Sequence, residues 1–328
     1  MAKGPSPQKR AADRRRRRAL ADVVLDRLGE RYDHPAWGGP RLDAVSELVL
    51  TILSQNTADT NSFRAFTALQ GRYATWDDVL GAPTDELEDV IRPGGLAPTK
   101  SRRIQHVLAE VKEATGGTWD LGFLGEWPLV EARDWLTSLP GIGRKTAAII
   151  LLFNFGRAAM PVDTHVHRVT TRLGMLPPRT PLTRAHDLLE EVLRPEEMYA
   201  FHVETIRHGR DTCRAPRPIC GLCPLTDVCP YFVLAMKGKA PMAPVPRSAA
   251  AVAGPPRYHD QLIHGWMPPS APSDGTPDAA GPRMRTDPSG PALDSGPPEE
   301  QQLCPNCGQP VGDTDTVCPH CGETLVGG

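Results

Sequence analysis

The sequence contains no long hydrophobic run and few aromatic residues. Phe, Trp and Tyr make up 5% of the 328 residues, and no segment approaches the roughly 20 consecutive apolar residues that a membrane-spanning helix needs. No apolar segment of the secretory type follows the arginines near the amino terminus. We therefore expect a soluble, cytoplasmic protein. A mitochondrial transit peptide would also be rich in arginine, but serine, which such peptides favour, is scarce there.

Charge of one sign does not dominate the chain, which has 37 Lys and Arg against 39 Asp and Glu. The distribution is uneven, however, because the run of five arginines at 14–18 lies in a segment whose single acid is Asp13. We expect residues 1–19 to be a disordered basic tail that either binds DNA phosphates or is simply solvated.

Cysteine is absent from the first 212 residues and then occurs in two tight groups of four. These are Cys213, Cys220, Cys223 and Cys229, and Cys304, Cys307, Cys318 and Cys321. A disulfide framework would scatter its cysteines along the chain, whereas in a reducing compartment such groups are typical metal ligands. The sequence therefore predicts two metal sites.

Apolar residues recur at helical spacing, and no segment shows convincing strand alternation. We expect helices at about 20–28, 45–53, 60–72, 84–91, 100–115, 129–138, 144–155, from 163, 183–193 and 196–207. The helix at 144–155 is almost wholly apolar but too short to cross a bilayer, so it should be buried between two layers. The predicted fold class is all-α.

Proline, with 35 residues, is about twice as frequent as the usual roughly 5%. It concentrates at 233–302, where Ala, Gly and Ser are also abundant and apolar anchors are few. Such a segment cannot bury enough surface to offset the entropy of ordering, so we expect a disordered linker. The final segment, 303–328, is too short for its own core and should depend on a metal.

Residues 139–143 have the sequence Leu-Pro-Gly-Ile-Gly, which predicts a tight hairpin between two helices. Amides at the start of the following helix, assisted by the helix dipole, form a natural site for a DNA phosphate. An ordinary turn between two helices is the alternative. The candidate DNA-binding residues of this helix-hairpin-helix are Leu139, Gly141, Ile142, Gly143 and Arg144.

Lys145 follows the hairpin, where a second phosphate contact is the simplest role for a lysine. A role as a nucleophile requires a neutral amine, and therefore a pKa several units below about 10.4, which burial or a neighbouring cation can cause. Asp163 opens a later helix. It suits an N-cap, worth about 1 kcal/mol, and also a carboxylate that stabilises positive charge on a sugar; the two roles are compatible.

The run from Leu139 through Lys145, the segment Val-Asp-Thr-His-Val-His-Arg-Val around Asp163, and the first cysteine group together resemble the endonuclease III family of DNA glycosylases over about 20–232. The resemblance implies two helical domains with DNA in the cleft between them. A six-helix barrel would span 36–157, and an iron-sulfur cluster domain would combine 20–35 with 158–232.

By the same resemblance, Lys145 matches the nucleophile that attacks C1′ and forms a Schiff base, and Asp163 matches the catalytic carboxylate. The adenine glycosylase branch resembles this chain too, but lacks a lysine at this position. We expect a monomeric, nucleoid-associated prokaryotic enzyme that removes oxidised pyrimidines from double-stranded DNA and cleaves abasic sites by β-elimination. The alternatives are a mismatch or uracil-type glycosylase with weak lyase activity, and a non-catalytic DNA-binding scaffold.

Chemistry on a base in duplex DNA requires extrusion of that base, and the vacated stack must be filled. Gln55 and Leu96 match the family's plug and wedge residues. By themselves, Gln55 would be a polar residue at a helix end and Leu96 a packing residue of a loop, in a segment that is unusually rich in proline.

The first cysteine group, with spacing C-x6-C-x2-C-x5-C, suits either zinc or a 4Fe-4S cluster. The resemblance favours the 4Fe-4S cluster, which would shape a loop that presents Arg214 and Arg217 to DNA. The second group forms two C-P-x-C knuckles, which predict a structural zinc ribbon with four sulfur ligands. This ribbon lies outside the usual family core and either recruits a partner, touches DNA or is a passive tail.

Overall fold

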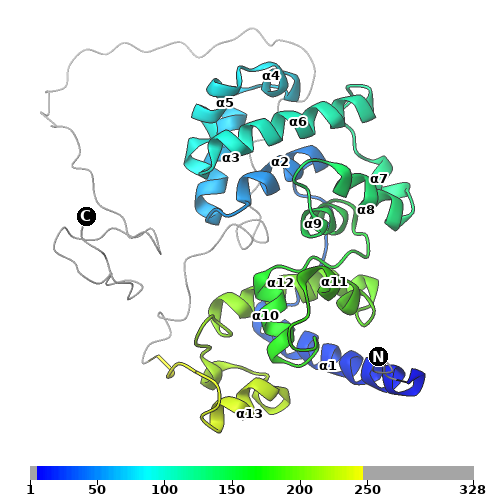
Figure 1. The fold of residues 1–328 in the computed structure, drawn as a ribbon, viewed down its shortest axis with the longest axis vertical. Helices are drawn as coiled ribbons and strands as arrows, with labels where there is room; N and C mark the ends of the chain where they lie inside the picture. Colours follow the sequence, from blue (N-terminus) through cyan, green and yellow to red (C-terminus); the bar gives the residue numbers. More distant parts are fainter. Residues whose placement is uncertain (1–5, 247–328) are drawn as a thin grey trace, which may run out of the picture. The chain divides into compact units, whose positions relative to one another are not determined.

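The computed structural model describes residues 6–246, and these residues form helices joined by short loops (Figure 1). The helices are α1 Pro7–Tyr32, α2 Ala44–Ser54, α3 Asp59–Arg72, α4 Trp76–Gly81, α5 Thr84–Ile91, α6 Ala97–Thr115, α7 Phe123–Glu126, α8 Leu129–Ser138, α9 Arg144–Phe155, α10 Thr164–Arg172, α11 Leu182–Glu190, α12 Met198–Asp211 and α13 Pro230–Met236. No strand occurs within 6–246, and the all-α prediction is confirmed. The expected zinc ribbon and most of the expected linker lie outside the described residues.

The described residues form two separate hydrophobic cores. One core joins side chains of α2, α3, α5, α6, α8 and α9, and the other joins α1, α10, α11 and α12. In Figure 1, α2–α9 form one group of helices and α1 lies with α10–α13 in the other, although α1 is first in the chain. We call these groups the barrel lobe and the cluster lobe.

Helix α9 belongs to both cores. Its Leu151 packs into the core of the barrel lobe and its neighbour Leu152 into that of the cluster lobe. Burial therefore extends around most of the helix, as its uniformly apolar sequence predicts. The position of its first turn is fixed by two cores at once.

Short polar signals determine where several helices begin. The Asp43 carboxylate caps α2 by accepting a hydrogen bond of 2.9 Å from the Ser46 amide, and Thr75 and Asp78 form a reciprocal capping box at α4. Helices α4, α7 and α13 were not expected from the sequence. They contain 6, 4 and 7 residues, too few for apolar residues to repeat at helical spacing.

The expectation of a disordered tail at 1–19 is wrong for residues 7–19, which form the first half of α1. The arginines there bind the end of α11 and the residues after it. Arg17, which is 6% exposed, donates to the Leu188 carbonyl at 3.2 Å, and Arg18 donates to the Val192 carbonyl at 2.7 Å. Carbonyls at a helix end lack partners within the helix and attract cations, so this basic run is a packing element.

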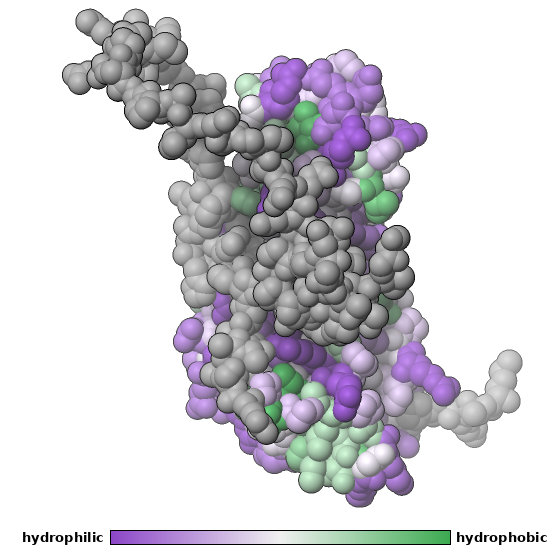
Figure 2. Space-filling model, turned by 90° about the vertical axis from the view of Figure 1, so that its left-hand side faces the viewer, coloured by the Kyte–Doolittle hydropathy of each residue, from purple (hydrophilic) through white to green (hydrophobic). Residues whose placement is uncertain are grey.

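Where the described residues are visible in Figure 2, their surface is largely hydrophilic, with a continuous weakly apolar area near the lower end of the view. Several exposed large apolar side chains lie together at the end of the described chain, namely Val233, Leu234, Met236, Met242 and Val245. No helix within 6–246 is long and apolar enough to span a membrane.

Removal of the Arg18 side chain should lower the free energy of unfolding by about 1–3 kcal/mol, because its guanidinium also binds the nearly buried Glu197 carboxylate at 2.5 and 2.9 Å. Urea denaturation of Arg18→Ala measures this change. Arg15→Ala, at an exposed position of the same helix, serves as the control. Equal stability of both variants and the wild type would show that the basic run is not a packing element.

Candidate active site and cysteine loop

The hairpin between α8 and α9 is held by its apolar side chains. Leu139 and Ile142 are each 4% exposed and pack into the core of the barrel lobe, and the Ile142 amide donates to the Leu139 carbonyl at 3.0 Å. Gly141 has φ +74°, a left-handed conformation that favours glycine. Leu139 and Ile142 therefore anchor the turn, and its exposed surface is the backbone at Gly141 and Gly143.

The first turn of α9 presents amides without a side-chain cap. Gly143 occupies the N-cap position, no side chain bonds to the turn, and a Cβ at Gly143 would meet only open space. These amides and the positive end of the helix dipole suit a phosphate. The structure thus supports the phosphate site expected at the hairpin.

Arg144, a predicted DNA-binding residue, pairs with carboxylates of the cluster lobe. Its guanidinium lies 2.5 Å from Asp187 and 3.4 Å from Glu190, both on α11. Arg133 of α8 also binds Glu190, at 3.0 Å. These ion pairs join the two lobes beside the hairpin and leave the exposed backbone, rather than Arg144, as the main feature that suits a phosphate.

The charge of Lys145 acts on the Asp163 carboxylate. Lys145 is exposed in the first turn of α9, so of the two causes of a neutral amine considered from the sequence, burial within the protein is not present. Asp163 is the N-cap of α10, where its carboxylate accepts a hydrogen bond of 2.7 Å from the Val166 amide.

Burial acts to raise the pKa of Asp163, but the surrounding groups outweigh it and hold the pKa below its usual value. The groups that lower it are the ring of His202, the Val166 amide, the ring of His165 and the ammonium of Lys145. Asp163 is therefore an ionised cap that faces the charge of Lys145, and both roles considered for it are compatible with the geometry.

Gln55 lies against the hairpin. It is the C-cap of α2, its side-chain amide donates to the Gly141 carbonyl at 3.1 Å, and its side-chain oxygen accepts from Arg103. The Arg103 guanidinium packs so closely on Gly141 that a Cβ there would clash with it. The structure therefore brings the predicted plug to the predicted phosphate site, although 86 residues separate them in the chain.

Leu96 is exposed in a strained backbone conformation. Its side chain is 56% exposed and its φ is +51°, in the left-handed region that costs a non-glycine residue of order 1–3 kcal/mol. An exposed apolar side chain in such a conformation suits a wedge better than it suits the packing of a loop.

Sequence reasoning did not single out Lys100 of α6. This lysine is 2% exposed, and its ammonium donates to oxygens of both the Gln55 loop and the Leu96 loop. Burial, together with the positive charge of Arg103, lowers the pKa of Lys100 to about 8. No sequence signal could have found it, because its surroundings depend on loops 47 and 6 residues away.

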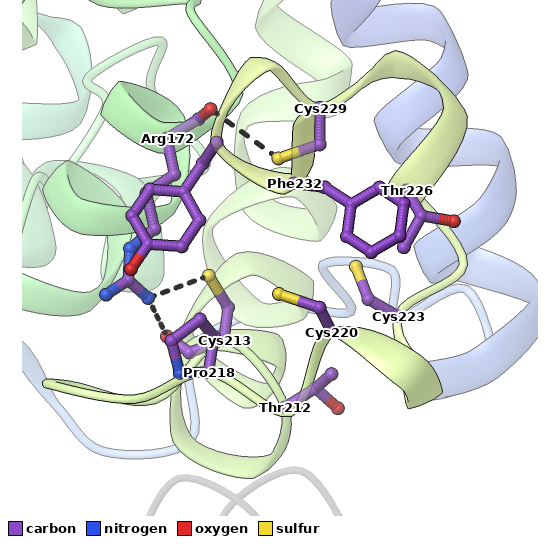
Figure 3. A pocket seen from close by; sticks show the side chains of 10 residues that line it. Arg172, Thr212, Cys213, Pro218, Cys220, Cys223, Thr226, Cys229 and Phe232 are labelled. Atoms are coloured by element: carbon purple, nitrogen blue, oxygen red, sulfur yellow. Dashed lines mark hydrogen bonds between the residues drawn. The ribbon is translucent and has the colours of Figure 1, made fainter. Parts of the chain in front are cut away.

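The four cysteines of the first group line one pocket in the cluster lobe, together with Arg172 and Phe232 (Figure 3). Arg172 donates to the Cys213 sulfur at 3.3 Å, and the Leu225 amide donates to the Cys223 sulfur at 3.4 Å. Donors of this kind stabilise sulfur ligands of iron clusters.

Burial raises the pKa of the Cys223 thiol to about 12, and burial with the neighbouring thiols also raises the pKa of Cys220 and of Cys229. Bound metal cations reverse this preference and stabilise thiolates. The donor set thus fits a metal group.

The two arginines of the cysteine loop contact backbone within the same lobe. Arg214 donates to the Arg210 carbonyl at 3.1 Å, and Arg217 donates to the Met242 carbonyl at 3.4 Å.

The HhH-GPD superfamily of base excision DNA repair proteins matches residues 49–195 of the chain, and a zinc-ribbon domain matches 300–325. Endonuclease III of Sulfolobus acidocaldarius is 34% identical over 197 residues, which are 60% of this chain and 85% of that protein. Endonuclease III of Bacillus subtilis is 32% identical over 208 residues, which are 63% of this chain and 90% of that one. The chain belongs to the endonuclease III family.

Solved structures of endonuclease III have the same fold. A non-covalent endonuclease III–DNA complex matches with a TM-score of 0.58 and 30% identity, over 67% of this chain and 98% of that one. A trapped endonuclease III–DNA covalent intermediate matches over the same shares, with the same TM-score and 29% identity.

Asp163→Asn should keep the helix cap but remove the charge, because asparagine caps helices as well as aspartate does. We expect base excision to fall about 10²- to 10⁴-fold with little change in thermal stability. Asp163→Ala should lose a further 1 kcal/mol or so of stability.

Single-turnover excision and thermal unfolding measure these effects. The matched control is Asp43→Asn, the same change at the N-cap of α2. Excision by Asp163→Asn at the wild-type rate would reduce Asp163 to a structural cap.

Proposed function

We propose that Lys145 is the nucleophile of a base-excision DNA glycosylase that also cleaves the strand at the resulting abasic site. The observation that carries this proposal is the exposed Lys145, which lies directly after the uncapped hairpin and whose positive charge helps to keep Asp163 ionised. The proposed substrate is double-stranded DNA with oxidised pyrimidines or abasic sites. The enzyme would act as a monomer on the DNA of a prokaryotic cytoplasm.

Binding would begin at the backbone of the hairpin, whose amides grip a phosphate without reading sequence. Gln55 and Leu96 would fill the stack that the extruded nucleotide leaves. Gln55 bonds to the Gly141 carbonyl of the hairpin, and Leu96 is the N-cap of α6. Their positions support the proposed roles of plug and wedge.

The reaction needs the neutral amine of Lys145. DNA that covers the first turn of α9 would remove water from this side chain, and desolvation favours the neutral form. The nitrogen then attacks C1′, a new N–C1′ bond forms, and the bond between C1′ and the base breaks with its electrons leaving on the base. The Asp163 carboxylate stabilises the positive charge that the sugar carries in this step.

Strand cleavage uses the same Lys145 nitrogen. The nitrogen passes one proton to the departing base, and its lone pair then breaks the C1′–O4′ bond while O4′ takes a proton from solvent. The resulting iminium between Lys145 and C1′ makes the proton on C2′ acidic. Loss of this proton and departure of the 3′ phosphate complete β-elimination, and water then releases the enzyme. A glycosylase without this lysine would stop after base release.

The first cysteine group would hold a 4Fe-4S cluster, because its four sulfurs surround one pocket and receive hydrogen bonds from Arg172 and Leu225. Such a cluster supplies cross-links that hold the loop. The second group, in the segment that matches a zinc ribbon, would bind one structural zinc through four thiolates.

Lys145→Ala should abolish the covalent adduct that borohydride traps between the enzyme and DNA with an abasic site, because no imine can form without the amine. The wild type should form the adduct, and so should the control Lys112→Ala, which removes an exposed amine of α6. Gel electrophoresis measures the fraction trapped.

An adduct undiminished in Lys145→Ala would contradict the assignment of the nucleophile. Absence of an adduct in the wild type, with binding intact, would instead favour a non-catalytic scaffold. Base release from duplexes with oxidised pyrimidines, uracil or mismatched thymine then tests the proposed substrate.

Metal content should separate the two cysteine groups. Cys223→Ala should lose iron but retain about one zinc per chain, and Cys307→Ala should retain iron but lose the zinc. Elemental analysis of the purified variants measures both, so that each variant is the control for the other. Zinc in place of iron at the first group would overturn the cluster assignment.

A further inference from the structure

A buried cation joins the loops that carry Gln55 and Leu96. The Lys100 ammonium donates to the Leu53 carbonyl at 2.6 Å, to the Thr57 hydroxyl at 2.6 Å and to the Gly94 carbonyl at 2.8 Å. An ammonium has three protons, so these bonds use all of them.

The three acceptors flank the plug and the wedge. Leu53 and Thr57 lie two residues before and two residues after Gln55, and Gly94 lies two residues before Leu96. The Thr57 hydroxyl in turn donates to the Gly94 carbonyl at 2.6 Å. Lys100 and Thr57 therefore form one polar network across both loops, which we call the loop lock.

Both loops have backbone conformations that need support. Asn56 and Leu96 have φ of +53° and +51°, in the left-handed region that non-glycine residues rarely adopt. Such conformations persist only where the surrounding structure holds them. The loop lock binds the Leu53 carbonyl before Asn56, the Thr57 hydroxyl after it and the Gly94 carbonyl before Leu96, so it supplies that support.

Burial of the Lys100 ammonium costs more free energy than a purely structural contact between the two loops would require. A cation that loses its water needs strong compensation, and the three oxygens that accept from Lys100 belong to two carbonyls and a hydroxyl, none of which is a carboxylate. An apolar side chain would fill the same space without this penalty, but it could not bind the two loops to each other.

We infer that Lys100 and Thr57 are positioning residues that couple the plug to the wedge, so that Gln55 and Leu96 enter the duplex together and extrude the damaged base. This inference rests on the proposed function. Lys100 is buried and acts only through the two loops. The coupling matters while a paired base must leave the stack, and it matters less at an abasic site, where no base has to be extruded.

The test compares base excision with strand cleavage at a preformed abasic site, both under single-turnover conditions. Thr57→Val keeps the shape of the side chain but removes the hydroxyl, and Thr57→Ser keeps the hydroxyl. We expect Thr57→Val to slow excision of a paired lesion about 10- to 100-fold, because small misplacements of this kind have such effects. Abasic-site cleavage should stay within about twofold, and Thr57→Ser should restore excision.

Two further measurements sharpen the result. Lys100→Met should have the same selective defect or a larger one, whereas Lys112→Met, at an exposed position of the same helix, should behave as the wild type. A mismatch opposite the lesion should reduce the defect of Thr57→Val, because a mismatched base costs less to extrude.

Excision by Thr57→Val at the wild-type rate would overturn the inference. So would an equal loss of excision and abasic-site cleavage together with a lower melting temperature, which would make the loop lock an element of stability alone. Failure of the wild type to excise any lesion or to cleave abasic DNA would instead reject the proposed function.

Discussion

The burial of α9 by two cores is the constraint on which the rest of the site depends. Leu151 and Leu152, neighbours in sequence, pack into different cores, so the helix cannot shift without opening one of them. Its exposed amino-terminal turn is thereby fixed in space. The hairpin amides and Lys145 owe their arrangement to the buried apolar side chains of α9, which take no part in the chemistry themselves.

Polar groups then arrange the site around this fixed helix. Arg144 reaches across to Asp187 and Glu190, and Arg210 of α12 binds Asp59 at the start of α3 at 3.0 Å, so ion pairs join the lobes at two places. Interactions of charged groups with limited exposure are geometrically specific, and they hold the two lobes in register. Gln55 in turn contacts the hairpin at Gly141, and Lys100 joins the loop that follows Gln55 to the segment before Leu96.

Local patterns in the sequence predicted much of this arrangement, and tertiary packing determined the rest. Apolar spacing predicted the longer helices. The candidate site was predicted from the order of Lys145, Asp163 and the first cysteine group along the chain, which resembles that of the endonuclease III family. The burial of Arg17 and of Lys100 was not predictable, because their acceptors are carbonyls 171 and 47 residues away. A charged residue in a sequence normally indicates a solvated surface. Only the tertiary structure shows which carbonyls accept hydrogen bonds from a buried Arg or Lys side chain.

The most direct test of the account is the identity of the amine that bonds to DNA. Borohydride-trapped complexes can be digested, and the peptide that carries the sugar remnant can be identified by mass spectrometry. Lys145 should be the single modified residue. Modification of Lys100, of another lysine or of the amino terminus would contradict it, because the geometry of the hairpin and α9 would then not define the nucleophile.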